Sequence, residues 1–159
     1  MYGKVEGTKE KMHVSIHIDA SREKVWHTML DLDSYKEWTT AFNPGSYYRG
    51  SWEEGSKILF LGPNPDGTSG EGGMVSRIRE NREFEYISIE HLGIYKDGIE
   101  DTESEEAKKW APAYENYKFI EKDGGTVVQV DMDILPEFRE EFEKMWNLGL
   151  QKLKEIAER

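Results

Sequence analysis

The carboxy-terminal run 136–158 limits most strongly what this chain can fold into. It combines good helix formers with a proline in the first turn, which predicts one long helix. At 1.5 Å per residue such a helix would span roughly 33 Å. Its apolar positions fall on one arc: Phe138, Phe142, Met145, Trp146, Gly149, Leu153 and Ile156. A stripe of this length must be buried against a large apolar surface, and a sheet is the surface that offers it.

That sheet is predicted between residues 46 and 134, where strand-sized runs are separated by clusters of Gly, Pro, Asn and Asp. In the clearest run, Thr126–Ile134, apolar and polar residues alternate as in a strand with one wet face. The expected strands lie near 46–50, 56–61, 71–80, 83–92, 112–121 and 125–134. The stretch 97–106 is acidic and contains no basic residue, so we expect a solvated loop there, with room for one helical turn.

The amino-terminal part is predicted to add one strand and two short helices. Residues 12–18 alternate between apolar and polar side chains, which favours a first strand. Apolar residues then recur at helical spacing and predict a helix over about 22–31. A second helix is expected around 34–38, with Asp33 as its capping residue.

The predicted fold class is therefore α+β: a curved seven-stranded antiparallel sheet wrapped around a long C-terminal helix, with two short helices after the first strand. We expect residues 1–10 to be a flexible N-terminal segment and residues 11–159 to form one domain. A chain of 159 residues is long enough to bury about 68 to 70% of the surface that its unfolded form exposes.

Composition excludes several functional classes. The net charge of −11 repels phosphate backbones, so nucleic acid is not expected as a partner. The absence of cysteine excludes disulfides, thiolate metal sites and cysteine nucleophiles. The longest purely apolar run, 58–61, is far shorter than the roughly 20 residues of a membrane span. The first residues also lack the apolar core of a secretory signal, so we expect a soluble, cytoplasmic protein.

The order of these elements resembles the helix-grip order of the START-like, or SRPBCC, superfamily, which is also called Bet v-like. The resemblance covers residues 11–158 and extends to short local motifs. These motifs are Ile16–Ser21 with Val25 and Trp26, Asp33–Trp38, Pro44–Ser46, Trp52–Ser56, Gly73 with Met74, and Leu150–Ile156. Among the branches, the chain looks most similar to small bacterial activator-of-heat-shock-ATPase homologues and polyketide cyclase-like proteins. Functions in the superfamily vary widely, so the resemblance implies a cavity more directly than a reaction.

A helix-grip fold implies a pocket between the sheet and the long helix, and pockets are mostly apolar with a few directed polar groups. The expected wall of this ligand-binding pocket consists of Trp38, Phe42, Phe60, Met74, Ile89, Tyr117, Phe119, Phe142, Met145, Trp146 and Gly149. For each of these positions we favour the alternative that the side chain simply fills the core. Gly149 is the exception, because a glycine in mid-helix costs about 0.8 to 1.0 kcal/mol relative to alanine. Its position suggests that a side chain there would obstruct either the sheet or a ligand.

Weak catalytic candidates are Glu115, His91 and Tyr117. Glu115 shares strand parity with Tyr117 and Phe119, so it points inward if those rings do. His91 ends a neighbouring strand and could pair with the carboxylate as an acid–base pole. The alternative, which we favour, places both groups at the end of the sheet in contact with water, because buried glutamates are rare without a partner.

No metal site and no cofactor are predicted. The glycines near residue 70 do not form a dinucleotide fingerprint, and no phosphate-binding loop or nucleophile elbow is present. His13 and His17 share a strand face but would lie roughly 13 Å apart, too far to bind one ion. We expect them, and His27, on the surface.

Three functions follow from this reading. The first is binding of a small hydrophobic or aromatic molecule, such as a lipid or a polyketide-like compound. The second is an enzyme of the polyketide cyclase type, and whether the chain is an enzyme is left open. The third is a chaperone-cofactor role or other protein-binding role, which keeps a protein partner in consideration. The chain is expected to be a monomer or a weak dimer.

Overall fold

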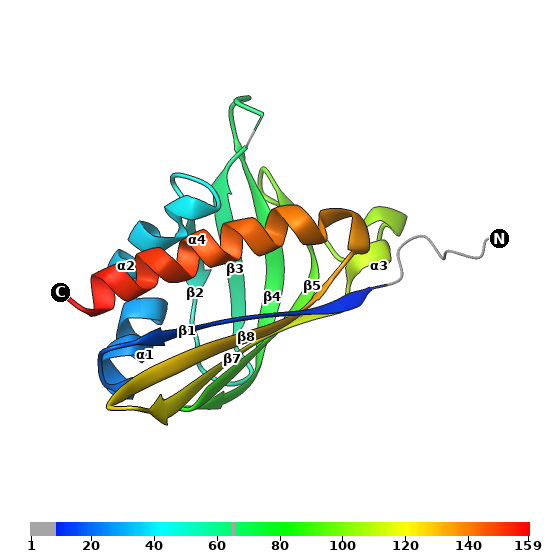
Figure 1. The fold of residues 1–159 in the computed structure, drawn as a ribbon. Helices are drawn as coiled ribbons and strands as arrows, with labels where there is room; N and C mark the ends of the chain where they lie inside the picture. Colours follow the sequence, from blue (N-terminus) through cyan, green and yellow to red (C-terminus); the bar gives the residue numbers. More distant parts are fainter. Residues whose placement is uncertain (1–8, 65) are drawn as a thin grey trace.

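A long curved antiparallel sheet and one long helix make up most of the structure (Figure 1). The computed structural model describes residues 9–64 and 66–159. The long helix, α4 (Arg139–Ala157), runs across the concave side of the sheet, and a short 3-10 helix, η2 (Pro136–Phe138), leads into it. The predicted long helix and its position across a sheet are therefore confirmed.

Seven strands form the continuous part of the sheet in the order β1-β8-β7-β5-β4-β3-β2, and every neighbouring pair is antiparallel. A short further strand, β6, pairs with β5 outside this path. The bounds are β1 (Glu10–Ile18), β2 (Tyr47–Gly50), β3 (Lys57–Pro63), β4 (Glu71–Arg82), β5 (Tyr86–Lys96), β6 (Ile99–Asp101), β7 (Ala113–Lys122) and β8 (Gly125–Ile134). The predicted fold class is confirmed, and β6 is an addition to it.

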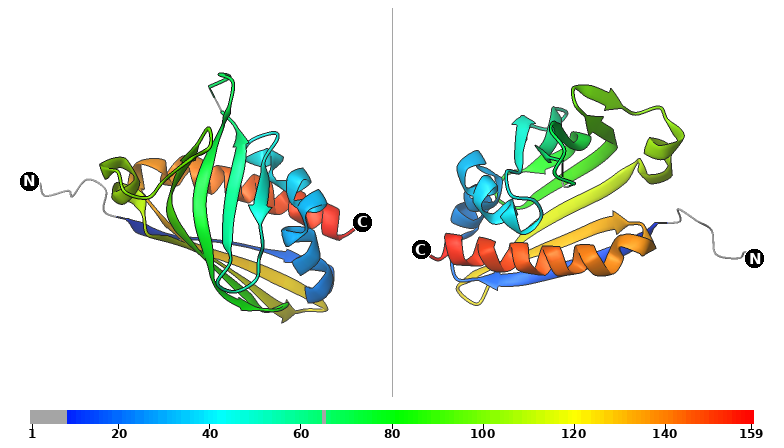
Figure 2. Two further views of the ribbon diagram at one scale, coloured as in Figure 1. Left: turned by 180° about the vertical axis from the view of Figure 1, so that it is seen from behind. Right: turned by 90° about the horizontal axis from the view of Figure 1, so that it is seen from above.

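The short helices gather at the two ends of α4. They are α1 (Arg22–Leu30), α2 (Leu32–Trp38), the 3-10 helix η1 (Thr39–Ala41) and α3 (Glu105–Trp110). Figure 2 shows α1 and α2 beside the carboxy-terminal half of α4, whereas α3 lies toward its amino-terminal end, where it packs on β5. No helix within the described residues is both long and apolar enough to cross a membrane.

The starts of the first two helices follow from their capping residues. The Ser21 hydroxyl accepts a hydrogen bond from the Lys24 backbone N–H at 3.2 Å, so α1 begins where the sequence predicts. The second helix begins earlier than predicted. Asp31 occupies its N-cap position with an extended backbone, and Asp33 lies inside the first turn instead of capping it.

The predicted flexible segment 1–10 falls largely on residues 1–8, which lie outside the described residues. Glu10 already belongs to β1, where it pairs with Ile134 on β8. The first strand therefore starts two residues before the predicted position at Met12.

Two predictions between β4 and β7 need correction. The strand expected over 83–92 begins only at Tyr86, because Phe84 adopts a positive φ of 66° in the turn that precedes it. The stretch 97–106 is largely exposed and leads into a helical turn, as expected, but it also contains the strand β6, which the sequence does not predict. A tight turn at Asp97 and Gly98, with φ of 47° and 88°, folds β6 back onto β5. Ser104 then caps α3 by accepting a hydrogen bond from the Ala107 backbone N–H at 3.1 Å.

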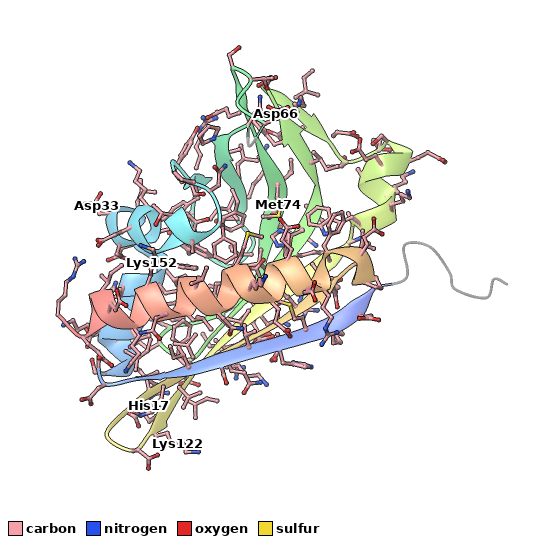
Figure 3. The ribbon with its side chains drawn as sticks, turned by 45° about the horizontal axis from the view of Figure 1, so that its top comes forward. His17, Asp33, Asp66, Met74, Lys122 and Lys152 are labelled. Atoms are coloured by element: carbon pink, nitrogen blue, oxygen red, sulfur yellow. The ribbon has the colours of Figure 1, made fainter. Side chains whose placement is uncertain are left out.

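The main core lies between the concave face of the sheet and α4, where Figure 3 shows side chains occupying the space between the two. Its buried members include Ile58, Ile78, Ile87, Ile89, Val128, Val130, Trp146, Leu150 and Leu153. A smaller cluster lies on the opposite face of the sheet and consists of Leu59, Leu61, Val75 and Tyr95. The strand β3 is therefore apolar on both faces, which explains why its sequence alone does not show which residues point inward.

Candidate functional site

Four polar side chains on the concave face form one buried hydrogen-bonded chain, referred to below as the polar chain. Ser76 Oγ lies 2.7 Å from His91 Nδ1, and His91 Nε2 lies 2.9 Å from Glu115 Oε1. The Tyr117 hydroxyl donates to Glu115 Oε2. Exposed fractions of 0% for Ser76, 2% for His91 and 8% for Glu115 place the chain inside the protein.

Three neighbouring strands bring these residues together. Ser76 on β4 is the register partner of His91 on β5, and Glu115 on β7 is the partner of Ile89 on β5. His91 and Glu115 are thus diagonal neighbours on one face, a distance that long side chains can span. Leu92 is the extra residue of a bulge between His91 and Gly93. Because a bulge changes which residues face a given side, the pattern around residue 92 could not be read from alternation alone.

Both nitrogens of the His91 ring have a hydrogen-bond partner. A carboxylate only accepts hydrogen bonds, so the ring is the donor in the bond between Nε2 and Glu115. Within the described residues, His91 is the one basic side chain within ion-pair distance of Glu115. No lysine or arginine among them therefore compensates this carboxylate directly.

Aromatic rings surround the polar chain. Trp110, the last residue of α3, stacks on the His91 ring with 5.3 Å between centroids, and Phe60 meets the same ring edge-on at 6.0 Å. Trp146 of α4 lies 5.9 Å from the Tyr117 ring. The concave face thus presents a few polar groups inside an aromatic frame, which is the usual composition of a small-molecule site.

The phenols beside Glu115 stay neutral at ordinary pH. Burial raises the pKa of Tyr117 well above its usual range, and the Glu115 carboxylate raises it further through its charge and its hydrogen bond. Burial likewise raises the pKa of the Tyr35 phenol, with Glu115 and Tyr48 adding to the effect. Tyr117 therefore remains a hydrogen-bond donor to the carboxylate.

The structure brings one group of the predicted pocket residues together at α4. The Trp38 and Trp146 rings lie 5.8 Å apart, and Phe42 lies 6.1 Å from the first and 5.0 Å from the second. A Cβ at Gly149 would lie 2.9 Å from Phe42 Cε1 and 3.5 Å from Trp38 Cε3. The group that approaches Gly149 is thus a pair of aromatic rings, so the expectation that it makes room for the sheet or a ligand needs correction.

The other predicted pocket residues are spread along the concave face. Phe119 packs on Trp26 of α1 at 5.1 Å, away from the rings around Gly149. Phe142 lies 6.3 Å from Phe138 at the beginning of α4. Trp38, Phe60, Ile89, Tyr117, Phe119 and Trp146 are buried, whereas Phe42, Met74, Phe142 and Met145 stay partly exposed.

The favoured placement of Glu115 and His91 at a wet end of the sheet is wrong. Both side chains are buried because β5 continues beyond His91 to Lys96 and Trp110 covers the His91 ring. Sequence reasoning also missed Ser76 and Trp110. Ser76 has the parity of Met74 on one strand, which could have indicated it, but Trp110 follows a stretch without a readable period.

The three other histidines lie at the protein surface and are exposed or partly exposed, as expected. His13 Nδ1 lies 2.5 Å from Asp131 Oδ1 across β1 and β8, and His17 Nε2 lies 2.8 Å from the Lys122 carbonyl. His27 is exposed and lies 3.2 Å from Asp31 Oδ1 within one helix face. These contacts pair each ring with an acceptor of the protein.

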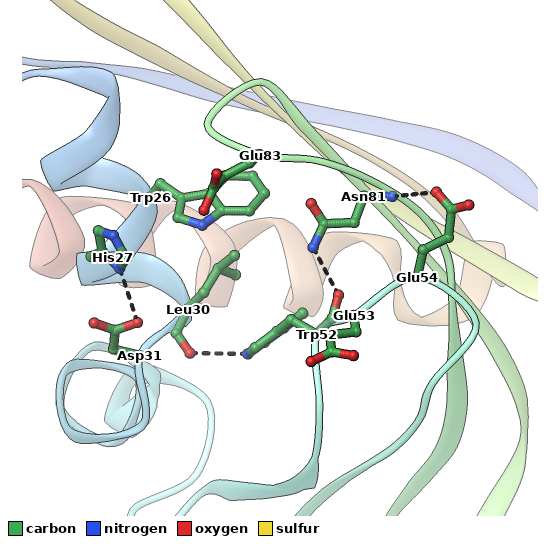
Figure 4. A pocket seen from close by; sticks show the side chains of 9 residues that line it. All are labelled: Trp26, His27, Leu30, Asp31, Trp52, Glu53, Glu54, Asn81 and Glu83. Carbon is green, nitrogen blue, oxygen red and sulfur yellow. Dashed lines mark hydrogen bonds and ion pairs between the residues drawn. The ribbon is translucent and has the colours of Figure 1, made fainter.

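A separate hollow lies between α1, the connection from β2 to β3 and the end of β4 (Figure 4). Its lining consists of Trp26, His27, Leu30, Asp31, Trp52, Glu53, Glu54, Asn81 and Glu83. The Trp52 indole N–H donates to the Leu30 carbonyl at 3.0 Å, and the Asn81 amide donates to the Trp52 carbonyl at 2.8 Å. These bonds hold the connection between β2 and β3 against α1 and β4. The polar groups that they join therefore have a structural role, and the hollow does not need a ligand to explain them.

The chain resembles proteins of known structure and one described family. The family model named Activator of Hsp90 ATPase homolog 1-like protein matches residues 19–158. No curated protein matches the chain.

Solved structures from bacteria share its fold. An AHSA1-like protein from Aeromonas hydrophila is 17% identical, with a TM-score of 0.67 over 92% of this chain and 90% of that one. The Aha1 dimer from Colwellia psychrerythraea is 16% identical, with a TM-score of 0.66 over 94% of this chain and 97% of that one. CalU16 from Micromonospora echinospora is 13% identical, with a TM-score of 0.64 over 94% of this chain and 76% of that one. At such low identities the likeness shows the fold alone.

Proposed function

The chain belongs to the family of Activator of Hsp90 ATPase homolog 1-like proteins, and we propose that it binds a small hydrophobic or aromatic molecule between its sheet and α4. A lipid or a polyketide-like compound is the class of ligand that we expect. One observation carries the proposal: the polar chain of Ser76, His91, Glu115 and Tyr117 lies inside an otherwise apolar, aromatic face.

Packing alone does not explain why the polar chain is present. Well-packed apolar residues can replace even a buried ion pair, often with no loss of stability. A sequence selected only to fill the space under α4 could therefore have used apolar side chains at His91 and Glu115. Keeping directed polar groups there is what a site that orients a ligand requires.

Four of the predicted pocket residues are partly exposed, and we propose that the ligand enters beside them. Phe42 follows η1, Met74 lies on β4, and Phe142 and Met145 lie on the amino-terminal half of α4. Burying about 300 Å² of apolar ligand surface at roughly 25 cal/mol per Å² gives about 7 kcal/mol before the costs of association. We expect micromolar to millimolar affinity.

The test is a titration of ¹⁵N-labelled protein with lipids, flavonoids and polyketide-like aromatics, followed by NMR. We expect saturable shifts at amides near Trp38, Met74, Tyr117 and Met145. The variant Met74→Trp should weaken binding because it narrows the space at the entrance. The matched variant Ile120→Trp changes an apolar position on β7 that is 42% exposed, and it should bind as the unchanged protein does. A well-folded sample that shows no shift with any compound refutes the proposal.

A second candidate function is proton-transfer catalysis of the polyketide cyclase type. The hydrogen bond between His91 and Glu115 favours it, because a histidine oriented by a carboxylate is a common general base. In this role the fold would hold a flexible substrate against the polar chain. Loss of turnover in Glu115→Gln would support it, and unchanged turnover in Glu115→Gln and His91→Ala would exclude these residues from catalysis.

A chaperone-cofactor role rests on the description of the family alone. It becomes the leading proposal if no small molecule binds and a purified chaperone ATPase is stimulated by the protein at low salt. Charged surfaces attract each other most strongly at low salt, so a failure to stimulate the ATPase under that condition counts against the chaperone-cofactor role.

A further inference from the structure

We propose that the Glu115 end of the polar chain selects ligands that carry a basic amine on an apolar or aromatic body. This inference rests on the proposed function and names the class of molecule that the same site would take.

The Glu115 carboxylate has capacity left for a ligand. Within the described residues Oε1 accepts from His91 and Oε2 accepts from Tyr117, one donor on each oxygen. A carboxylate offers about four acceptor positions, so each oxygen can take a further donor. An ammonium group carries three N–H donors and no acceptor, which suits the free acceptor positions of this carboxylate.

Glu115 is also the more exposed member of its pair. Its side chain keeps 11% of its surface exposed, against 3% for the His91 side chain. Ser76, at the other end of the polar chain, is fully buried. A ligand that enters the concave side would therefore contact the carboxylate before the imidazole or the serine hydroxyl.

Charge and aromaticity favour a cation over an anion at this position. Burying a carboxylate is costly unless a cation pairs with it, and His91 is the one basic side chain within ion-pair distance among the described residues. The Tyr117 ring, whose hydroxyl contacts Glu115, lies 5.9 Å from the Trp146 ring, and aromatic faces attract cations. The net charge of −11 attracts amines and repels acids at longer range.

Three probes with one ring system separate the alternatives: 2-naphthylmethylamine, 2-naphthylmethanol and 2-naphthoic acid. Their affinities are measured by NMR titration of the full chain at pH 7. We expect the amine to bind about tenfold more tightly than the alcohol, because a charge-assisted hydrogen bond is roughly twice as strong as a neutral one. The acid should bind most weakly of the three.

The matched variant is Glu115→Gln, which keeps the size of the side chain and removes its charge. In this variant the preference for the amine over the alcohol should fall to about one, while the alcohol still binds. Glu121→Gln serves as the control, because it removes one carboxylate from the exposed part of the same strand, where the side chain is 75% exposed, so the preference for the amine should persist. If the glutamine variant does not fold, intermolecular NOEs between the probe methylene and the Tyr117 ring in the unchanged protein decide, and their absence refutes the inference.

The possible results distinguish this inference from the proposed function. Equal or tighter binding of the alcohol or the acid refutes the amine preference and leaves hydrophobic binding standing. An amine preference that survives Glu115→Gln refutes the role of Glu115. Absence of binding by all three probes overturns this inference, and the wider panel of lipids and flavonoids then decides on the proposed function by itself.

Discussion

Tyr35 and Tyr117 should make the protein lose stability in alkaline solution by an amount that the structure allows one to calculate. Burial and the Glu115 carboxylate raise the pKa of both phenols in the folded state. A group whose pKa is raised on folding supports the folded state fully below its unfolded pKa, and this support is lost as pH rises above that value. An unfolded tyrosine titrates near pH 10, so the loss begins there.

The size of the loss follows from the number of retained protons. If a folded phenol stays protonated while its unfolded counterpart ionises, the free energy of unfolding falls by about 1.4 kcal/mol between pH 9 and pH 11. Tyr35 and Tyr117 together therefore account for at most about 2.7 kcal/mol over this interval. Tyr117 should carry its full share because it is 4% exposed, and the partly exposed Tyr35 should carry less.

Urea unfolding at pH 9, 10 and 11 measures this loss, and the phenylalanine variants isolate it. Lysines also titrate in this range, so the comparison of interest is between the unchanged protein and Tyr117→Phe or Tyr35→Phe. Each variant should show a smaller loss between pH 9 and pH 11, by up to about 1.4 kcal/mol. Identical pH dependence in the unchanged protein and in both variants would show that the buried phenols are not responsible, and the reasoning would be wrong.

Three further predictions concern packing and hydrogen bonding, each measured by urea unfolding. His91→Ala should destabilise the protein by about 3 kcal/mol, because it leaves Glu115 Oε1 and the Ser76 hydroxyl without a partner; a loss below about 1 kcal/mol would contradict this. Gly149→Ala should be destabilising in the unchanged protein, where the new Cβ would lie 2.9 Å from Phe42 Cε1, and stabilising by up to about 1 kcal/mol in a Phe42→Ala background. The same sign in both backgrounds would refute the steric explanation. Ser104→Ala should cost about 1 kcal/mol and speed hydrogen exchange within α3, and unchanged exchange would show that the cap does not hold the helix.

Much of the fold could be predicted from periodicity, because both the long helix and the sheet bury one face and expose the other. The arc of apolar residues over 136–158 and the alternation over Thr126–Ile134 identify α4 and β8 independently, and each needs the other as a packing surface. Parity also placed Glu115 on the same face as Tyr117 and Phe119, as the structure has it. These predictions succeed because each depends only on which face of a single helix or strand is buried.

The rest of the site depends on relations between strands, which a single sequence does not contain. His91 meets Ser76 only because a bulge at Leu92 shifts the register of β5 against β4. Trp110 reaches the His91 ring only because a tight turn at Gly98 and a short capped helix direct the chain back over β5. Nothing in the local pattern at these positions indicates either contact.

The polar chain poses an energetic question that bears on both proposals. Its side chains satisfy one another, since within the described residues no buried side-chain nitrogen or oxygen lacks a hydrogen-bond partner. A fully satisfied network can therefore persist without a ligand, and its hydrogen bonds hold the Glu115 carboxylate in one orientation. A ligand would then meet a group that is already oriented, and little conformational entropy would be lost on binding. This reasoning predicts that His91→Phe, which keeps a ring in place and removes both hydrogen bonds, weakens binding of an amine probe as well as lowering stability. Unchanged affinity for the amine in a folded His91→Phe protein would indicate that the network serves the fold and not a ligand.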